Sequence, residues 1–468
     1  MSYLSIEFAV SFIVFFGIYW GLKRHIVLQN SLLLIVSYVI VGLFNIHFAL
    51  ILAGYTIIIY LLSIGIAHSS APRGWLVLAC IVAVVNLAIF KYCDFFRAEL
   101  QLLLNAVGWH LLLPSAEILL PIGISFYTFH SISYLVSLSK KELKPVSFWD
   151  FALYLSFFPS IVAGPINRAK HFLPQIQTTH IRTLLEPYRA LTLILLAVIK
   201  VYWLSSALAD YYVNPIFDSP QEYQSFDLIL GLYAYAIEIY LNFSGYTDLV
   251  TAIALLLGFR LPINFNLPYL AINLRDFWQR WHISLSTWIR DYIYIPLGGS
   301  RINVTRTQIN VLIAMLLSGL WHGAGMNFLL WGAIHGIGLV MLNVADRLLG
   351  VNVIARRSAL IAKLFTLHYV CFAWLFFRSA SLSDALDYLQ AIAHNMTDVA
   401  MKYNSLLTII ILLIAYCFYP KWSTIPTYFS RFLAKMPWFI LPVIFICILW
   451  LVIYLAPSGI PQFIYAGF

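Results

Sequence analysis

Long apolar stretches separated by short polar breaks recur from one end of the chain to the other. A helix that crosses a bilayer needs about 20 apolar residues, and the stretch at residues 31–67 is long enough for two, divided near Asn45 and His47. The other stretches are 6–22, 75–90, 111–138, 151–163, 191–208, 226–258, 311–340, 360–377, 406–418 and 439–454. The pattern predicts an all-α, polytopic membrane protein with roughly ten to twelve transmembrane helices.

The first stretch is followed, not preceded, by a pair of basic residues, Lys23 and Arg24. A secretory signal peptide has the opposite order, with its charges before the apolar run. We therefore expect a retained membrane helix that starts outside and places Lys23 and Arg24 in the cytoplasm. Several later stretches are short or interrupted by Pro, Gly and Asn, and these predict re-entrant helices packed against protein.

The longest stretch that cannot span a membrane is 259–310, which carries six arginines and no lysine. The positive-inside bias places much of it on the cytoplasmic side. Apolar residues recur at helical spacing over 274–289, which predicts an amphipathic interfacial helix. A polar strip on the same helix contains Arg275, Gln279, His282, Ser286 and Arg290, so one histidine lies between two arginines.

Composition supports the membrane interpretation and excludes several other classes. Apolar residues make up 62% of the chain and charged residues 10%, which is too apolar for a standard cytosolic enzyme of this length. The 28 Lys and Arg exceed the 19 Asp and Glu by nine, but no basic block of five occurs, so we expect no nucleic-acid partner. The five cysteines are single and form no C-x-x-C pair, which is typical of small buried side chains.

Two histidines are candidates for chemistry, His282 and His322. His322 follows an apolar run and is flanked by Trp321 and Gly323. An ionisable group at membrane depth is a functional hypothesis by default, and a buried neutral imidazole can act as a general base. A purely structural histidine remains the alternative. His335, thirteen residues further on, would point the opposite way on one continuous helix, so it need not share the site.

Neither candidate histidine has a carboxylate or cysteine at ligand spacing beside it, so we predict no metal site. The chain also lacks a Walker P-loop, a G-x-S-x-G elbow, an H-E-x-x-H motif and a G-x-G-x-x-G motif. The common nucleotide-binding, hydrolase and zinc-protease sites are therefore not indicated.

An ordered set of motifs resembles the membrane-bound O-acyltransferase family, in particular its bacterial branch of polysaccharide O-acetyltransferases. The motifs are PIGISFYTF at 121–129, FPSIVAGPI at 158–166, NFSGYTD at 242–248, NFNLPY at 264–269, DFWQRWHISLS at 276–286, RDYIYIPLGGSR at 290–301, SGLWHGAG at 318–325 and FAWLFFR at 372–378. We expect a single membrane domain over residues 1–468, with its family-like core at 121–378.

The resemblance implies roles for particular residues. His322 stands where the family keeps its intramembrane histidine, and His282 corresponds to the second, supporting histidine. The implied fold is a ring of tilted helices around a thinned centre, with a tunnel between the two sides of the membrane. The further residues that we expect to contact donor or acceptor are Arg280, Asp291, Arg290, Trp321, Asn242 and Tyr246.

The resemblance also implies a reaction. A cytoplasmic acyl donor, acetyl-CoA, would supply acetyl without any bound cofactor, and a periplasmic SGNH-type transferase would complete transfer to a polysaccharide. We expect the protein in the bacterial cytoplasmic (inner) membrane, surrounded by lipid. The opening residues favour peptidoglycan as the acceptor over alginate, and D-alanyl transfer to teichoic acid is a related alternative. From other classes, a transporter or flippase that uses Glu238 and Asp248, or a structural scaffold, would also be polytopic.

Overall fold

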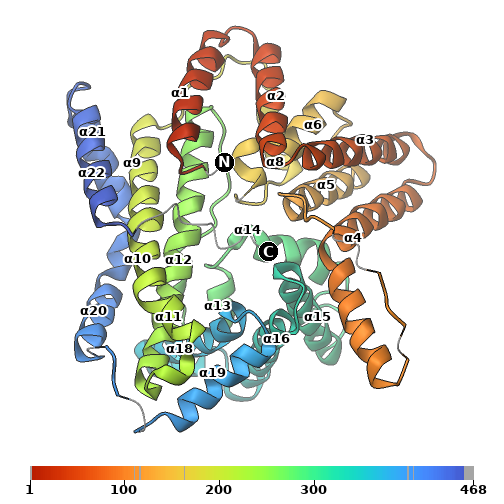
Figure 1. The fold of residues 1–468 in the computed structure, drawn as a ribbon. Helices are drawn as coiled ribbons and strands as arrows, with labels where there is room; N and C mark the ends of the chain where they lie inside the picture. Colours follow the sequence, from red (N-terminus) through yellow and green to blue (C-terminus); the bar gives the residue numbers. More distant parts are fainter. Residues whose placement is uncertain are drawn as a thin grey trace. The chain divides into compact units, whose positions relative to one another are not determined.

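The computed structural model describes residues 3–109, 111–114, 118–162, 164–397, 400–403 and 405–457. Within these ranges the chain forms helices and turns and contains no strand, which confirms the predicted all-α class (Figure 1). The helices group into two compact units. One unit comprises Met1–Leu185 with Ile253–Pro262, and the other comprises Glu186–Ala252 with Ile263–Phe468. The predicted single domain over residues 1–468 remains a prediction.

The first unit is built from the N-terminal helices. Its elements are α1 (Ile6–Gly21), α2 (Ile26–Phe44), α3 (Ile46–His68), α4 (Pro72–Ala106), α5 (Ile124–Ser139), α6 (Phe148–Ser156), α7 (Phe158–Ile161) and α8 (Ala169–Ile176). The break between α2 and α3 lies at Asn45, as predicted. Asn45 has an extended backbone, and its side-chain oxygen accepts a hydrogen bond from the His47 N–H at 2.9 Å, which caps α3.

Two boundaries in this unit differ from the sequence prediction. Helix α4 continues past Phe90, the end of the predicted apolar stretch, and runs through the polar residues 91–94 to Ala106. These residues include no proline or glycine, so nothing in the backbone stops the helix, and Asp94 pairs with Arg97 one turn on. Helix α5 begins only at Ile124, after Gly123 in the left-handed region, where a Cβ would lie 2.7 Å from the Ile161 carbonyl oxygen.

The second unit contains the longer part of the chain. Within it α21 and α22 pack against α9, and α16 packs against both α15 and α18 (Figure 1). Its elements are α9 (Pro187–Val198), η1 (Ile199–Ser205), α10 (Ser206–Leu208), η2 (Ala209–Val213), α11 (Asn214–Asp218), η3 (Pro220–Glu222), α12 (Ser225–Leu256, whose last turn belongs to the first unit), η4 (Pro268–Leu270), α13 (Leu274–Trp278), α14 (Ile283–Ile289), η5 (Arg290–Tyr294), α15 (Val304–His322), α16 (Met326–Leu349), α17 (Val353–Arg357), α18 (Ala359–Arg378), α19 (Leu382–His394), α20 (Ser405–Phe418), η6 (Tyr419–Ser423), α21 (Ile425–Lys435) and α22 (Leu441–Leu455).

Seven helices in the described ranges are long and apolar enough to cross a membrane. The bent pair Leu407–Ser423 and Ile425–Lys435, with 59° between its parts, raises the number to eight if it is one span. This is fewer than the ten to twelve crossings predicted, because several apolar stretches form shorter helices. Ile6–Gly21 and Leu441–Leu455 have 16 and 15 residues, and the stretch at 151–163 is divided between α6 and α7.

Candidate functional site

His322 is placed by a helical hairpin made of α15 and α16 (Figure 1, teal). It is the last residue of α15, the chain turns at residues 323–325, and α16 begins at Met326. The two helices pack closely because glycines face each other, and a Cβ on Gly332 would lie 2.5 Å from the Met315 carbonyl oxygen. The apolar stretch at 311–340 is therefore two antiparallel helices, and His322 lies at the turn between them.

The hairpin corrects the expectation for His335. A continuous helix through His322 and His335 is wrong, because the chain becomes extended at Gly323 and leaves the helix there. The reversal of the chain brings both histidines close to the side chain of Trp331. The ring of Trp331 lies 4.9 Å from the ring of His322 and 4.8 Å from that of His335. His335 therefore belongs to the same aromatic neighbourhood as His322.

Aromatic rings enclose the imidazole of His322. The ring centroids of Trp321, Trp331 and Phe377 lie 4.7, 4.9 and 5.0 Å from it, at interplanar angles of 68°, 85° and 75°. Edge-to-face contacts of this kind fix the orientation of a ring. Only 2% of His322 is exposed, so the enclosure shields it from bulk solvent.

His282 occupies an irregular point in the backbone. Its φ is +42° and its ψ +53°, a left-handed conformation that costs about 1–3 kcal/mol for a residue other than glycine. Asn264 supports this turn from a second segment. Its carbonyl accepts from the Ile283 N–H at 3.0 Å, and its side-chain oxygen accepts from the Ser284 hydroxyl at 2.6 Å. Two chain segments therefore fix the position of His282.

This turn also corrects the predicted interfacial helix. The residues 274–290 form two short helices, α13 and α14, so the strip from Arg275 to Arg290 does not run down one continuous helix. The apolar residues still recur at helical spacing through residues 274–289, because both short helices bury apolar side chains. The break at residues 279–282 directs the side chain of His282 inward, and only 1% of it is exposed.

Trp321 connects the two histidines. Its ring centroid lies 5.9 Å from that of His282 and 4.7 Å from that of His322, and Phe243 of α12 contacts His282 at 4.7 Å. Burial lowers the pKa of His282 to about 3, because the charged imidazolium loses its hydration. His282 is therefore neutral at physiological pH. We call these four side chains, with Trp331 and Phe377, the histidine enclosure.

The remaining predicted site residues fall into two groups. Asn242 and Tyr246 are buried on α12, the helix that supplies Phe243 to the enclosure. The charged residues form ion pairs with near neighbours. The Arg280 guanidinium binds Asp276 at 2.7 Å, and that of Arg290 binds Asp291 at 2.8 Å with both side chains at least 36% exposed. Arg290 and Asp291 thus form a surface pair.

Sequence reasoning missed Asn264, Phe243, Trp331 and Phe377 as parts of the site. All four lie inside or beside the motifs that carry the family resemblance, which was the available signal. Spacing along the chain could not reveal them, because they come from the α12–α13 connection, α12, α16 and α18, and only the fold brings these segments together.

The two carboxylates considered for a transporter have different surroundings. Asp248 of α12 forms an ion pair at 2.6 Å with Lys200, which lies in the π-helical segment η1. Glu238 is 6% exposed, and the Ser205 hydroxyl donates to its backbone carbonyl at 3.4 Å. In the part of the chain that the structure describes, no group of three or more His, Cys, Asp or Glu side chains could hold a metal ion.

Comparisons with known proteins identify the family. The model of the membrane-bound O-acyltransferase family matches residues 116–383. A probable alginate O-acetylase of Pseudomonas aeruginosa is 36% identical over 382 residues, covering 80% of this chain and 71% of the relative. A peptidoglycan O-acetyltransferase of Helicobacter pylori is 31% identical over 76% of this chain and 72% of its own length. A teichoic acid D-alanyltransferase of Bacillus subtilis is 27% identical over 55% of this chain and 68% of its own length. With its apolar helices and the match over residues 116–383, this chain belongs to the membrane-bound O-acyltransferase family and is a multi-span membrane acyltransferase.

Proposed function

We propose that this protein takes acetyl from cytoplasmic acetyl-CoA and passes it across a bacterial inner membrane for O-acetylation of an extracytoplasmic polysaccharide. The observation that carries the proposal is the histidine enclosure, in which two buried histidines lie on either side of Trp321. A buried neutral imidazole is suited to proton transfer during attack on a thioester. The relatives named as O-acetylases support acetyl as the group transferred.

In the proposed reaction His322 is the general base. An acceptor hydroxyl, on the polymer or on a partner transferase, gives its proton to a ring nitrogen of His322 as its oxygen attacks the acetyl carbonyl carbon. The carbon–sulfur bond then breaks and an ester forms. The CoA thiolate leaves and takes the proton from the imidazolium, which restores the neutral histidine. His282 orients donor or acceptor, and its rigid turn suits a positioning role.

The charged residues at the surface are proposed to meet the donor. Arg280 and Arg290 carry guanidinium groups that match the phosphates of CoA, and Asp291 holds Arg290 through its ion pair. Trp321, Asn242 and Tyr246 are proposed to line the substrate path beside the histidines. No bound cofactor is required, because acetyl-CoA is consumed as a substrate.

The acceptor and partner complete the proposal. A periplasmic SGNH-type transferase is proposed to finish transfer to the polymer. The sequence favours peptidoglycan, whereas the relatives include an alginate O-acetylase at 36% and a peptidoglycan O-acetyltransferase at 31% identity. Membranes should therefore be supplied with each polymer in turn, together with the partner, and ester-linked acetate measured on both.

The deciding experiment uses membrane vesicles that contain the protein and its partner, with radiolabelled acetyl-CoA outside. We expect His322→Ala to abolish labelling of the acceptor and His282→Ala to reduce it, at equal protein levels. His394→Ala is the matched control, because His394 is exposed at the end of α19. Full labelling with His322→Ala would overturn the assignment. Movement of polymer without CoA release would identify a transporter instead.

A further inference from the structure

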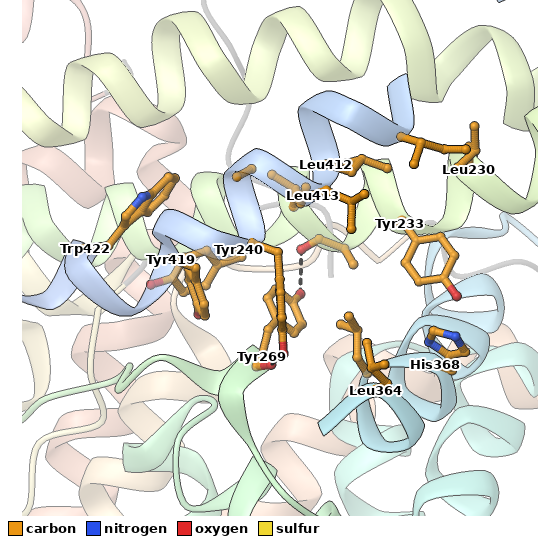
Figure 2. Close-up of a pocket in the computed structure, with 16 residues that line it drawn as sticks. Leu230, Tyr233, Tyr240, Tyr269, Leu364, His368, Leu412, Leu413, Tyr419 and Trp422 are labelled. Carbon is orange, nitrogen blue, oxygen red and sulfur yellow. Dashed lines mark hydrogen bonds between the residues drawn. The ribbon is translucent and has the colours of Figure 1, made fainter. Parts of the chain in front are cut away.

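A cavity of about 250 Å³ lies in the second unit, between α12, α18 and α20 (Figure 2). Its side walls are formed by Leu230 and Ile237 of α12, by Leu364 of α18, and by Leu412 and Leu413 of α20. At one end Figure 2 shows Tyr240, Tyr269, Tyr419 and Trp422 gathered together, and at the other end Tyr233 and His368. We call this space the α12–α20 pocket.

The walls of the α12–α20 pocket do not suit water. None of the residues that line it is Lys, Arg, Asp or Glu, and all except His368 are Leu, Ile, Ala, Tyr or Trp. The hydroxyl of Tyr269 is already donated to the Ala236 carbonyl, and that of Tyr416 points to the Tyr269 carbonyl at 3.5 Å. A buried water needs two to four polar partners, and an empty space forfeits dispersion contacts. The favoured content is therefore hydrocarbon.

The pocket is elongated along the helices. On α12 its residues are Leu230, Tyr233, Ala236, Ile237 and Tyr240, which recur on one helical face. Ten residues of helix span about 15 Å at 1.5 Å per residue. That length is about half of the ~30 Å hydrocarbon core of a bilayer, the depth of one leaflet. The pocket thus matches the dimensions of a single extended acyl chain.

The pocket is continuous with the surface that faces lipid. Leu364 and Leu413, on opposite walls, are 39% and 58% exposed and mark its mouth. Beside Leu413 on α20, Ile410, Ile411 and Ile414 are also exposed. Helices α12 and α18 are long and apolar enough to span a membrane, and α20 belongs to the bent spanning pair. A bilayer lipid could enter sideways without crossing any polar surface.

We propose that the α12–α20 pocket binds one acyl chain of a bilayer phospholipid. An acetyl group is too small to fill it, and a helix from a second copy, about 10 Å wide with its side chains, is too thick. Phospholipid surrounds this surface in the membrane, so no other source of hydrocarbon is needed. This inference does not depend on the proposed acetyl transfer.

The bound chain would support the wall of the histidine enclosure. Tyr269 lines the pocket, and its ring lies 6.1 Å from that of Trp281. Trp281 lies 5.0 Å from Trp374, which stacks on Trp331 at 6.0 Å. Trp331 in turn contacts His322. One row of packed rings therefore joins the pocket to the enclosure, so an empty pocket would leave the first ring of this row without support on one side.

The test is retention of phospholipid by the purified protein, counted by native mass spectrometry after a delipidating detergent wash. We expect one phospholipid on the wild-type protein and none on Leu412→Trp, whose indole fills the pocket. Ile411→Trp is the matched control. Ile411 is next to Leu412 in the chain, but its side chain is 56% exposed and does not line the pocket. The Ile411→Trp variant should retain the lipid.

A second pair of variants, on another helix, controls for loss of lipid through misfolding. Leu364→Trp on α18 should also lose the lipid, while Ile361→Trp, at a position that is 60% exposed, should keep it. Each variant must elute as a single species in size-exclusion chromatography. Absence of phospholipid from the wild-type protein, equal retention by pocket and control variants, or a non-phospholipid occupant would overturn the proposal.

Discussion

The histidine enclosure and the α12–α20 pocket are both rich in aromatic rings, yet they are built differently. The enclosure forms where the backbone is irregular, with His282 in a left-handed turn and His322 at the end of a helix. The pocket forms between regular helices with apolar faces. A break in a helix inside a membrane protein must be supported by the surrounding protein, so it holds its side chains at fixed points. The regular helices around the pocket instead leave an apolar space, which we propose that lipid fills. Changes in the two regions should therefore have different consequences.

The largest effect is expected from His322. His322→Gln keeps a polar side chain of similar size but removes the proposed base, so we expect the rate of the proposed acetyl transfer to fall by about 10²–10⁴-fold. Leu412→Trp in the pocket should change the rate only a few-fold. Both are measured with labelled acetyl-CoA in vesicles at matched expression. A similar loss of rate in the two variants would contradict the view that only the histidine enclosure takes part in the chemistry.

Close packing of the α15–α16 hairpin should dominate the stability of the enclosure. Gly332→Ala places a methyl group against the Met315 carbonyl oxygen and should lower the free energy of unfolding by about 1–3 kcal/mol. Gly54→Ala on α3 is the control, because nothing lies within 4 Å of that position. It should be neutral or stabilising by up to about 1 kcal/mol. Chemical unfolding in detergent measures both, and equal effects would contradict the packing argument.

Substitution of Asn264 tests whether the backbone turn at His282 contributes to activity. Asn264→Ala removes the acceptor for the Ser284 hydroxyl and should cost about 1–3 kcal/mol of stability. It should also lower kcat about tenfold with little change in KM, because His282 loses its fixed position. Asn264→Asp keeps an acceptor oxygen and should restore most of the rate. If neither variant affects kcat, the turn has a structural role alone.

Acid should destabilise the protein through His282. Its pKa is about 3 in the folded chain and 6.5 when unfolded, so between these values the unfolded state binds more protons and stability falls as the pH decreases. At pH 5.5 the loss is on the order of 1 kcal/mol. The unfolding free energies of wild-type protein and His282→Gln, measured from pH 8 to 5, should show a shallower slope for the variant. Parallel slopes would contradict a buried neutral His282.

The smallest effect is expected at the surface pair. Arg290→Ala breaks an exposed ion pair with Asp291, which typically contributes less than about 1 kcal/mol. If Arg290 meets the donor, the KM for acetyl-CoA should rise a few-fold while kcat stays the same. Arg301→Ala is the control, at another exposed arginine of the same segment. An equal KM for acetyl-CoA in the Arg290→Ala and Arg301→Ala variants would contradict a role for Arg290 in binding the donor.

Periodicity predicted the helices where the chain is regular. The spans at α2, α3, α12 and α18 lie close to their predicted ranges, because long apolar runs in lipid leave the backbone no alternative to helix. It failed at 274–290, where helical spacing continued through a break. Side chains alone do not reveal a left-handed turn held by Asn264, since that turn depends on hydrogen bonds from a segment about 20 residues away.

The sequence by itself determined the membrane environment of this protein, its all-α class and its family, and it predicted His282 and His322 as the histidines for chemistry. Each follows from residue type and order, which set hydropathy and motif independently of the fold. Only the tertiary structure decided that α15 and α16 reverse at residues 323–325, that His335 lies near His322, and that Trp321 lies between the two candidate histidines. The physical reason is that burial and ring packing depend on contacts between distant segments, which spacing along the chain does not encode.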